Sequence, residues 1–172
     1  IGVNAMAFSP DGRYFIRGLQ GGGDVSFWDA TKWRRIFKLP GHDFLGGRME
    51  AFRFSPDGRY VVSGSSEKTI KYDVATGQIT KKAKIGFMSG AFSPDGRYVC
   101  RMGIDVLELW DIEAEKRLWS IGSIRGSAAK LRTTGGARTV AFSFDGKMIL
   151  TGEGDEIRLR DASSGRLVKS IG

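Results

Sequence analysis

Short apolar segments alternate with polar turns along the whole chain. In the stretch from 52 to 73, apolar residues occur at Phe52 and Phe54, again at 60–62, and again at Ile70 and Tyr72. Runs this short, rich in β-branched and aromatic residues and bounded by Gly, Pro, Asp and Ser, are typical of β-strands. No apolar run approaches the roughly 18 residues that a membrane-spanning helix needs. The pattern predicts an all-β protein and no membrane partner.

One turn sequence recurs four times. Phe-Ser-Pro-Asp-Gly begins at Phe8, Phe54 and Phe92, and Phe-Ser-Phe-Asp-Gly begins at Phe142. Proline presets the first corner of a type I turn, aspartate suits the second corner, and glycine suits the exit. The copies are roughly 40 to 50 residues apart, a period typical of propellers and solenoids rather than of one wound domain.

Each copy divides into four short strands. In the first copy, the strand ending at Phe8 is followed by strands at 14–17, 25–28 and 35–38. The third strands end in Trp28-Asp29, Tyr72-Asp73, Trp110-Asp111 and Arg160-Asp161. Four short strands joined by turns form a small antiparallel sheet. We therefore predict one region, 1–172, built from repeats at approximately 1–41, 42–85, 86–122 and 123–172.

The four turns, the strand-ending Trp-Asp or Xaa-Asp pairs and the Gly41-His42 pair resemble the WD-repeat (WD40) β-propeller family. The resemblance covers the whole chain. It implies an all-β propeller segment of four blades, each with four antiparallel strands, arranged around a central channel. It also implies that the fourth strand of each blade is outermost, and that the blades act as a rigid platform for partners rather than as a catalyst.

The resemblance sets expectations for packing. Phe54 and its equivalents Phe8, Phe92 and Phe142 are predicted to be buried. Members of the family often tie a blade together with a Trp, Ser/Thr, His and Asp hydrogen-bond set, but His42 is the only histidine and Tyr72 replaces one Trp. No copy clearly completes that set, so we expect rigidity mainly from apolar packing and the turns.

A single cysteine and a single histidine exclude an internal disulfide and any Cys/His metal cage built from this chain alone. Cys100 occupies the column that holds Ile16, Val62 and Leu150, so we expect a buried packing thiol. His42 lies at the structural Gly-His position of the family rather than beside a nucleophile. We predict no catalytic residue, no cofactor and no metal, and the lack of disulfides favours an intracellular, cytoplasmic protein.

Charge is the strongest compositional bias. The chain has 27 Lys+Arg against 19 Asp+Glu, a net charge of +8. Many of the basic residues flank or occupy the fourth strands: Lys32, Arg34, Arg35, Lys38, Lys81, Lys82, Lys84, Lys116, Arg117, Arg166 and Lys169. Such residues can serve to block unwanted strand pairing, or they can attract an acidic partner.

These features predict a non-catalytic scaffold for protein–protein interaction within a larger protein or complex, with partners that have an acidic surface. The alternative is a basic module that binds RNA or DNA in a ribonucleoprotein or chromatin-type assembly. No RNA-reading motif is present, so nucleic acid is the less favoured partner.

Two columns of unlike residues stand out in the otherwise repeated frame. Four positions before each turn phenylalanine and nine positions after it, the side chains differ among the copies, and the resemblance places both columns near one mouth of the ring. The candidate partner-binding residues are Asn4, Glu50, Met88, Arg138, Arg17 and Arg101. Each can equally be a solvated side chain. The insertions at 43–48 and within 123–138 are either tolerated surface loops or binding loops.

The commonest ring of the family has seven blades, and four repeats are too few to make it. We expect further blades, supplied by the same polypeptide or by a second copy of the chain. A closed four-blade ring is the remaining alternative.

Overall fold

The computed structural model describes residues 2–19, 25–40, 49–103, 106–122, 139–153 and 156–172. Within these ranges sixteen strands form four antiparallel sheets of four strands, and in each sheet the strands are hydrogen-bonded in chain order. The predicted all-β fold of four four-stranded sheets is confirmed.

We call the sheets blades 1 to 4. Blade 1 contains β1 (Val3–Phe8), β2 (Tyr14–Leu19), β3 (Val25–Asp29) and β4 (Arg34–Leu39). Blade 2 contains β5 (Met49–Phe54), β6 (Tyr60–Ser65), β7 (Thr69–Asp73) and β8 (Ile79–Ala83). Blade 3 contains β9 (Gly90–Phe92), β10 (Tyr98–Met102), β11 (Val106–Asp111) and β12 (Lys116–Gly122). Blade 4 contains β13 (Val140–Phe142), β14 (Met148–Glu153), β15 (Glu156–Asp161) and β16 (Leu167–Ile171).

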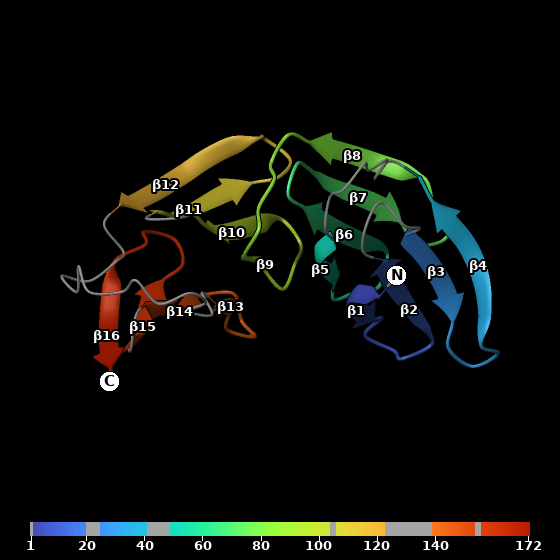
Figure 1. Ribbon diagram of the computed structural model, residues 1–172, viewed down its shortest axis with the longest axis horizontal. Helices are drawn as coiled ribbons and strands as arrows, with labels where there is room; N and C mark the ends of the chain where they lie inside the picture. Colours follow the sequence, from blue (N-terminus) through green and yellow to red (C-terminus); the bar gives the residue numbers. More distant parts are fainter. Residues whose placement is uncertain (1, 20–24, 41–48, 104–105, 123–138, 154–155) are drawn as a thin grey trace.

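The blades stand side by side around an arc that is open on one side (Figure 1). The first strands lie on the inside of the arc, where β1 contacts β5, β5 contacts β9, and β9 contacts β13. The fourth strands β4, β8, β12 and β16 lie on the outside (Figure 1).

The repeated turn explains why the first hairpin forms identically in every blade. In blade 1 the Ser9 hydroxyl donates to Asp11 Oδ1 at 2.6 Å, and the backbone N–H of Tyr14 donates to Ser9 Oγ at 2.9 Å. Gly12 has a φ of 69°, which a residue without Cβ adopts at little cost. The hydrogen bond from Ser9 is the main reason that the pKa of Asp11 lies below its ordinary value.

The hairpin between the third and fourth strands of each blade is held by the aspartate that ends the third strand. The Thr31 hydroxyl donates to Asp29 Oδ1 at 2.6 Å, and the Ser163 and Ser164 hydroxyls both donate to Asp161 Oδ1 at 2.7 Å. These bonds lower the pKa of Asp161 to about 2. The strand-ending aspartates are therefore turn residues.

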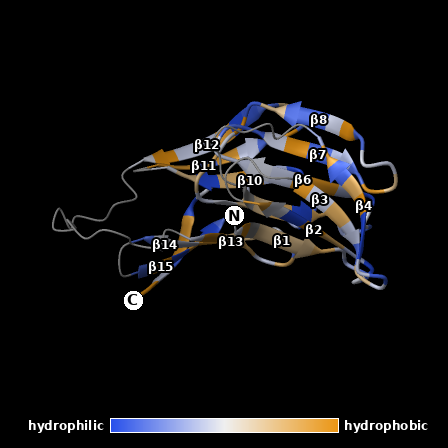
Figure 2. Cartoon of the chain, turned by 45° about the vertical axis from the view of Figure 1, so that its right-hand side comes forward, coloured by the Kyte–Doolittle hydropathy of each residue, from blue (hydrophilic) through white to orange (hydrophobic). Residues whose placement is uncertain are grey.

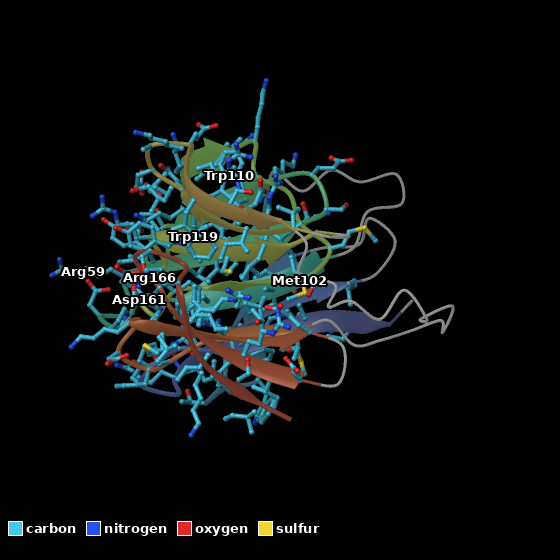
Figure 3. The ribbon with its side chains drawn as sticks, turned by 90° about the vertical axis from the view of Figure 1, so that its left-hand side faces the viewer. Arg59, Met102, Trp110, Trp119, Asp161 and Arg166 are labelled. Carbon is cyan, nitrogen blue, oxygen red and sulfur yellow. The ribbon has the colours of Figure 1, made fainter. Side chains whose placement is uncertain are left out.

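These two hairpins of a blade, which join the first strand to the second and the third to the fourth, lie at the same edge of the arc, which we call the turn rim. The other ends of the strands form the opposite rim. Figure 3 views the arc from the side: Arg59, Asp161 and Arg166 lie at the turn rim, and Met102 lies toward the opposite rim.

Neighbouring blades pack face to face through apolar side chains. We call the face that a blade turns to the preceding blade its leading face, and the other its trailing face. Ile16, Val25 and Phe27 on the trailing face of blade 1 share one core with the leading face of blade 2. The leading-face residues in that core are Phe52, Phe54, Val61, Ile70 and Tyr72. Cys100, on the trailing face of blade 3, is buried in the core shared with blade 4, as predicted.

The prediction that Phe8 is buried is wrong, and equivalent positions differ in burial at the two ends of the arc. Phe54 and Phe92 are buried and Phe142 is half-buried, but Phe8 is 63% exposed. Leu150 is 42% exposed although Val62 and Cys100, its equivalents, are buried. The reason is the same in both cases: among the described residues, no blade packs against the leading face of blade 1 or the trailing face of blade 4.

Polar ties supplement the apolar packing within and between blades. Trp28 Nε1 donates to Ser26 Oγ at 2.8 Å within blade 1. The Tyr72 hydroxyl donates to the carbonyl of Pro40 at 2.9 Å, which links blade 2 to the end of blade 1. Tyrosine thus makes a different bond where tryptophan was expected.

Candidate partner-binding surfaces

The two predicted binding columns meet at the opposite rim. Arg101, near the end of β10, pairs with Gly90 at the start of β9. Thr151 in β14 pairs with Val140 at the start of β13. The strand registers thus bring together the beginning of the first strand and the end of the second, where sequence comparison located variable residues.

Met88 is the most exposed described side chain in these columns, at 78%. It follows Phe87, whose buried ring packs edge-on against Phe92 with the ring centroids 5.6 Å apart. This anchor holds the segment between β8 and β9 against blade 3. Asn4 and Glu50 lie in β1 and β5, but their side chains and the whole of Arg138 lie outside the described residues.

Arg17 is engaged within blade 1. Its guanidinium lies 4.9 Å from the centroid of the Trp28 ring, and its Nε donates to Ser26 Oγ at 3.3 Å. The side chain is half-buried on the leading face of blade 1, away from the core shared with blade 2. Arg17 is therefore placed to contact whatever covers that face.

Arg101 belongs to a charged cluster centred on buried Glu108. Arg101 Nε donates to Glu108 Oε2 at 2.5 Å, and Arg117 donates to Oε1 at 2.8 Å. Burial raises the pKa of Glu108, but the hydrogen bonds from Arg117, Arg101 and Trp110 outweigh that effect and leave the pKa below its ordinary value. Arg101 also donates to the carbonyl of Gly86 at 3.0 Å, so it joins blade 3 to the segment that follows blade 2.

A second charged cluster, centred on Glu153, was not predicted. Arg158 donates to Glu153 Oε2 at 2.6 Å, and Arg160 donates to Oε1 at 3.0 Å. The Thr151 hydroxyl also donates to Oε1, at 2.6 Å. The available signal was Arg160 in a column otherwise filled by aromatic residues, because a buried arginine requires a carboxylate partner.

The outer strands carry an exposed basic belt, which we define as Arg34, Lys82, Lys116, Arg166 and Lys169. All five side chains are exposed, and among the described residues none of them forms an ion pair. Hydrophilic residues recur along β8 at the outside of the arc (Figure 2). Two lysines outside the belt are neutralised by nearby carboxylates. Lys71 pairs with Glu113 at 2.7 Å, and Lys81 pairs with Glu115 at 3.0 Å.

A groove of about 510 Å³ lies at the turn rim between blades 1 and 2. Its apolar walls include Phe27, Ile36 and Phe37 from blade 1 and Tyr60 and Val74 from blade 2. The sequence offered no direct signal for it, because the groove depends on how β4 faces the turns of the next blade.

Groups capable of chemistry are sparse in the described ranges. No cluster of three or more His, Cys, Asp or Glu side chains with metal-binding geometry occurs there. Burial raises the pKa of the Cys100 thiol to about 12, so this thiol stays protonated at neutral pH. His42 lies outside the described residues. The described part of the fold also contains no helix long and apolar enough to cross a membrane.

Four-stranded antiparallel sheets, packed face to face around an arc with their first strands inside, define a segment of a β-propeller. The family model of the WD domain, G-beta repeat, matches residues 2–29 and 33–72. With four in-phase copies of the same turn and strand pattern, the chain belongs to the WD40-repeat β-propeller family.

Solved structures agree on the fold. The chain is similar to the β-propeller domain of Myceliophteria thermophila Cps50 (Swd1), with a TM-score of 0.79 and 19% identity over 98% of this chain and 55% of that one. Kuenenia stuttgartiensis hydrazine synthase gives a TM-score of 0.72 and 23% identity over 98% and 48%. The C-terminal WD40 domain of Sif2 gives 0.68 and 17% over 98% and 46%.

The chain thus spans about half the length of the solved structures that it matches. At these identities the likeness establishes the fold alone. A comparison with curated proteins finds no match.

Proposed function

We propose that this WD40 segment is a non-catalytic, intracellular platform that binds an acidic surface of a protein partner. Supporting the proposal is the basic belt on the outer strands. Its positive side chains project from a rigid sheet edge and have no acidic partner among the described residues.

The belt acts mainly through the electric field of several like charges. Single exposed ion pairs contribute little, but a row of unneutralised cations raises the rate of encounter with an acidic surface and selects against basic ones. Around the arc, the belt spans all four outer strands. An extended acidic segment can therefore contact several blades at once.

The opposite rim supplies residues that differ from blade to blade. Exposed Met88 offers a flexible apolar contact, the kind of side chain used at adaptable binding surfaces. We assign attraction to the belt and selectivity to the column residues Asn4, Glu50, Met88, Arg138, Arg17 and Arg101.

The test is a binding titration of the 172-residue chain with a fluorescent polyglutamate peptide, and separately with single- and double-stranded oligonucleotides of unrelated sequence. The double variant Arg34→Glu/Lys116→Glu changes the belt. The double variant Arg59→Glu/Lys147→Glu makes the same charge change at exposed turn-rim positions and serves as the matched control.

We expect the peptide to bind with an affinity that falls as salt is raised, and we expect the belt variant to lose binding while the control largely retains it. Stronger oligonucleotide binding with a steep salt dependence, abolished by the belt variant, would instead establish the nucleic-acid alternative. Equal losses in both double variants would show that net charge alone matters, and the belt would then have no specific role.

A further inference from the structure

One turn position decides how each blade meets the outer strand of the preceding blade. It lies four residues after the strand-ending aspartate: Trp33, Gly77, Glu115 and Gly165 in blades 1 to 4. A Cβ on Gly77 would lie 3.0 Å from the Phe37 ring, and one on Gly165 would lie 3.0 Å from the Trp119 ring. Glu115 instead pairs with Lys81 at 3.0 Å. Glycine therefore faces an aromatic ring, and glutamate faces a lysine.

Among the described residues, no outer strand of another blade lies against Trp33. Its side chain is 74% exposed, and its φ of 50° is one that two of the other three copies adopt with glycine. A bulky residue in the left-handed region costs conformational energy. An exposed tryptophan ring on a backbone of positive φ indicates that Trp33 makes a contact that a single arc does not provide.

Trp33 belongs to a continuous aromatic surface on the leading face of blade 1. Phe15 lies between the others, with its ring centroid 5.8 Å from Phe8, 5.8 Å from Trp28 and 6.1 Å from Trp33. The equivalents of these residues in blade 2, among them Phe54, Val61 and Tyr72, are buried against blade 1.

The trailing face of blade 4 is the other uncovered face. Leu150, Ile157 and Ile171 are exposed there, whereas Ile16, Val25 and Leu39, at the same positions in blade 1, are buried. Strand register puts Lys169 at the position of Phe37, Lys81 and Trp119, the outer-strand residues that meet the following turn.

We propose that two copies of this chain associate head to tail, with the leading face of blade 1 in each copy packed on the trailing face of blade 4 in the other. Two arcs then close an eight-bladed ring with twofold symmetry. The arc in Figure 1 is open on one side, and the chain covers 55% of the solved Cps50 propeller domain.

The side chains at the contact favour a second copy as the occupant. At Trp33 the bulk is on the turn, whereas Gly77 and Gly165 carry no side chain and lie directly against the rings of Phe37 and Trp119. Lys169 is flexible, and its ammonium can lie over the indole, as the guanidinium of Arg17 lies over Trp28. The aliphatic face of blade 4 covers the aromatic face of blade 1, as apolar trailing faces cover apolar leading faces inside the arc.

A contact between the first turns of neighbouring blades supports the same arrangement of the two copies. Pro10 approaches Gly58 of the next blade, and Pro94 approaches Gly146. Blade 4 carries exposed Phe144 where the other copies have proline, and Gly12 in blade 1 has open space beside it. In the ring, Phe144 of one copy lies against Gly12 of the other.

The test is sedimentation velocity of the 172-residue chain across micromolar concentrations. We expect a dimer. Trp33→Lys sets two ammonium groups against each other and should weaken association at least about tenfold, the effect of losing a modest interface hot spot. Trp33→Glu should retain the dimer through an ion pair with Lys169, as Glu115 pairs with Lys81, and its affinity should become sensitive to salt.

Lys169→Glu in the Trp33→Glu background should dissociate the dimer, and Lys169→Glu in the Trp33→Lys background should restore it. Leu118→Ser, which alters an exposed apolar side chain on neither open face, is the control and should leave association unchanged. Circular dichroism and melting curves check that each variant folds.

A monomeric wild-type chain overturns the proposal, as does a growing series of higher oligomers. A dimer broken equally by Trp33→Lys and Trp33→Glu, and indifferent to Lys169, would mean that two aromatic faces meet each other, and it too would refute the head-to-tail ring.

Discussion

The boundaries between blades 1 and 2 and between blades 2 and 3 use opposite chemistry at the same backbone positions. Phe27 and Phe37 on the trailing face of blade 1 become Lys71 and Lys81 in blade 2. The turn that meets them changes in parallel, from Ala75 and Gly77 to Glu113 and Glu115, which form the two ion pairs. Closer to the central axis both boundaries stay apolar.

The difference separates stability from selectivity. Packing of buried apolar side chains supplies most of the free energy of association between blades. Partly exposed ion pairs add little to that total, but they disfavour wrong neighbours by unpaired or like charges. The apolar inner zone, which contains buried residues such as Phe54 and Phe92, therefore holds blades together. The outer zone, formed at the first boundary by Phe37 and Gly77 and at the second by Lys81 and Glu115, specifies which blades are neighbours.

The largest effect is expected from the apolar zone. Phe54→Ala should lower the free energy of unfolding by about 3 to 5 kcal/mol, because it removes a buried ring from the core shared by blades 1 and 2. Urea unfolding followed by circular dichroism measures the change. Leu118→Ala, at an exposed position on β12, is the control, and a similar loss in both variants would contradict the burial assigned to Phe54.

Exchanging the outer-zone chemistry should have an intermediate and asymmetric effect. Gly77→Glu places a side chain against the Phe37 ring at a φ of 69°, and about 1 to 3 kcal/mol should be lost through strain and overpacking. Glu115→Gly should change stability little, because the lost ion pair is offset by relief of a positive φ. The same urea experiment compares them, and a symmetric pair of losses would argue against distinct zones.

The smallest effect concerns pH. Hydrogen bonds from Lys81 and from the backbone N–H of Lys84 hold the pKa of Glu115 below its ordinary value of 4.5. Because the folded pKa is lowered, its stabilising contribution is complete above pH 4.5 and is lost as pH falls through the folded pKa. The stability difference between wild type and Glu115→Gln should therefore shrink on acidification and with added salt. A difference that is constant from neutral to acidic pH would show that the pair contributes nothing.

Local chemistry made the fold predictable from sequence. The Ser and Asp of each turn form hydrogen bonds within a few residues, and the Gly adopts the positive φ that the turn needs. The hairpins and the four-strand repeat could therefore be predicted from the sequence. Burial of Phe8 was predicted wrongly, because it depends on a neighbouring blade rather than on the repeat to which the residue belongs; the exposure of Leu150 has the same cause.

The candidate site was harder to predict. Repeat alignment identified the two variable columns, the family resemblance correctly placed them at one rim, and exposed Met88 was among them. It did not show that Arg101 is tied to Glu108, or that Arg160 is tied to Glu153, since these pairs depend on cross-strand register and on the space left between blades. Whether the column residues bind a partner stays a prediction.

The buried thiol of Cys100 can report how often blades 3 and 4 separate transiently. With a pKa of about 12, and enclosed between blades 3 and 4, it can be alkylated only in the fraction of molecules whose blades have separated. When reclosing is fast, the alkylation rate is proportional to that fraction, so it gives the free energy of local opening rather than of global unfolding. As the chain has one cysteine, the signal comes from a single seam of the propeller.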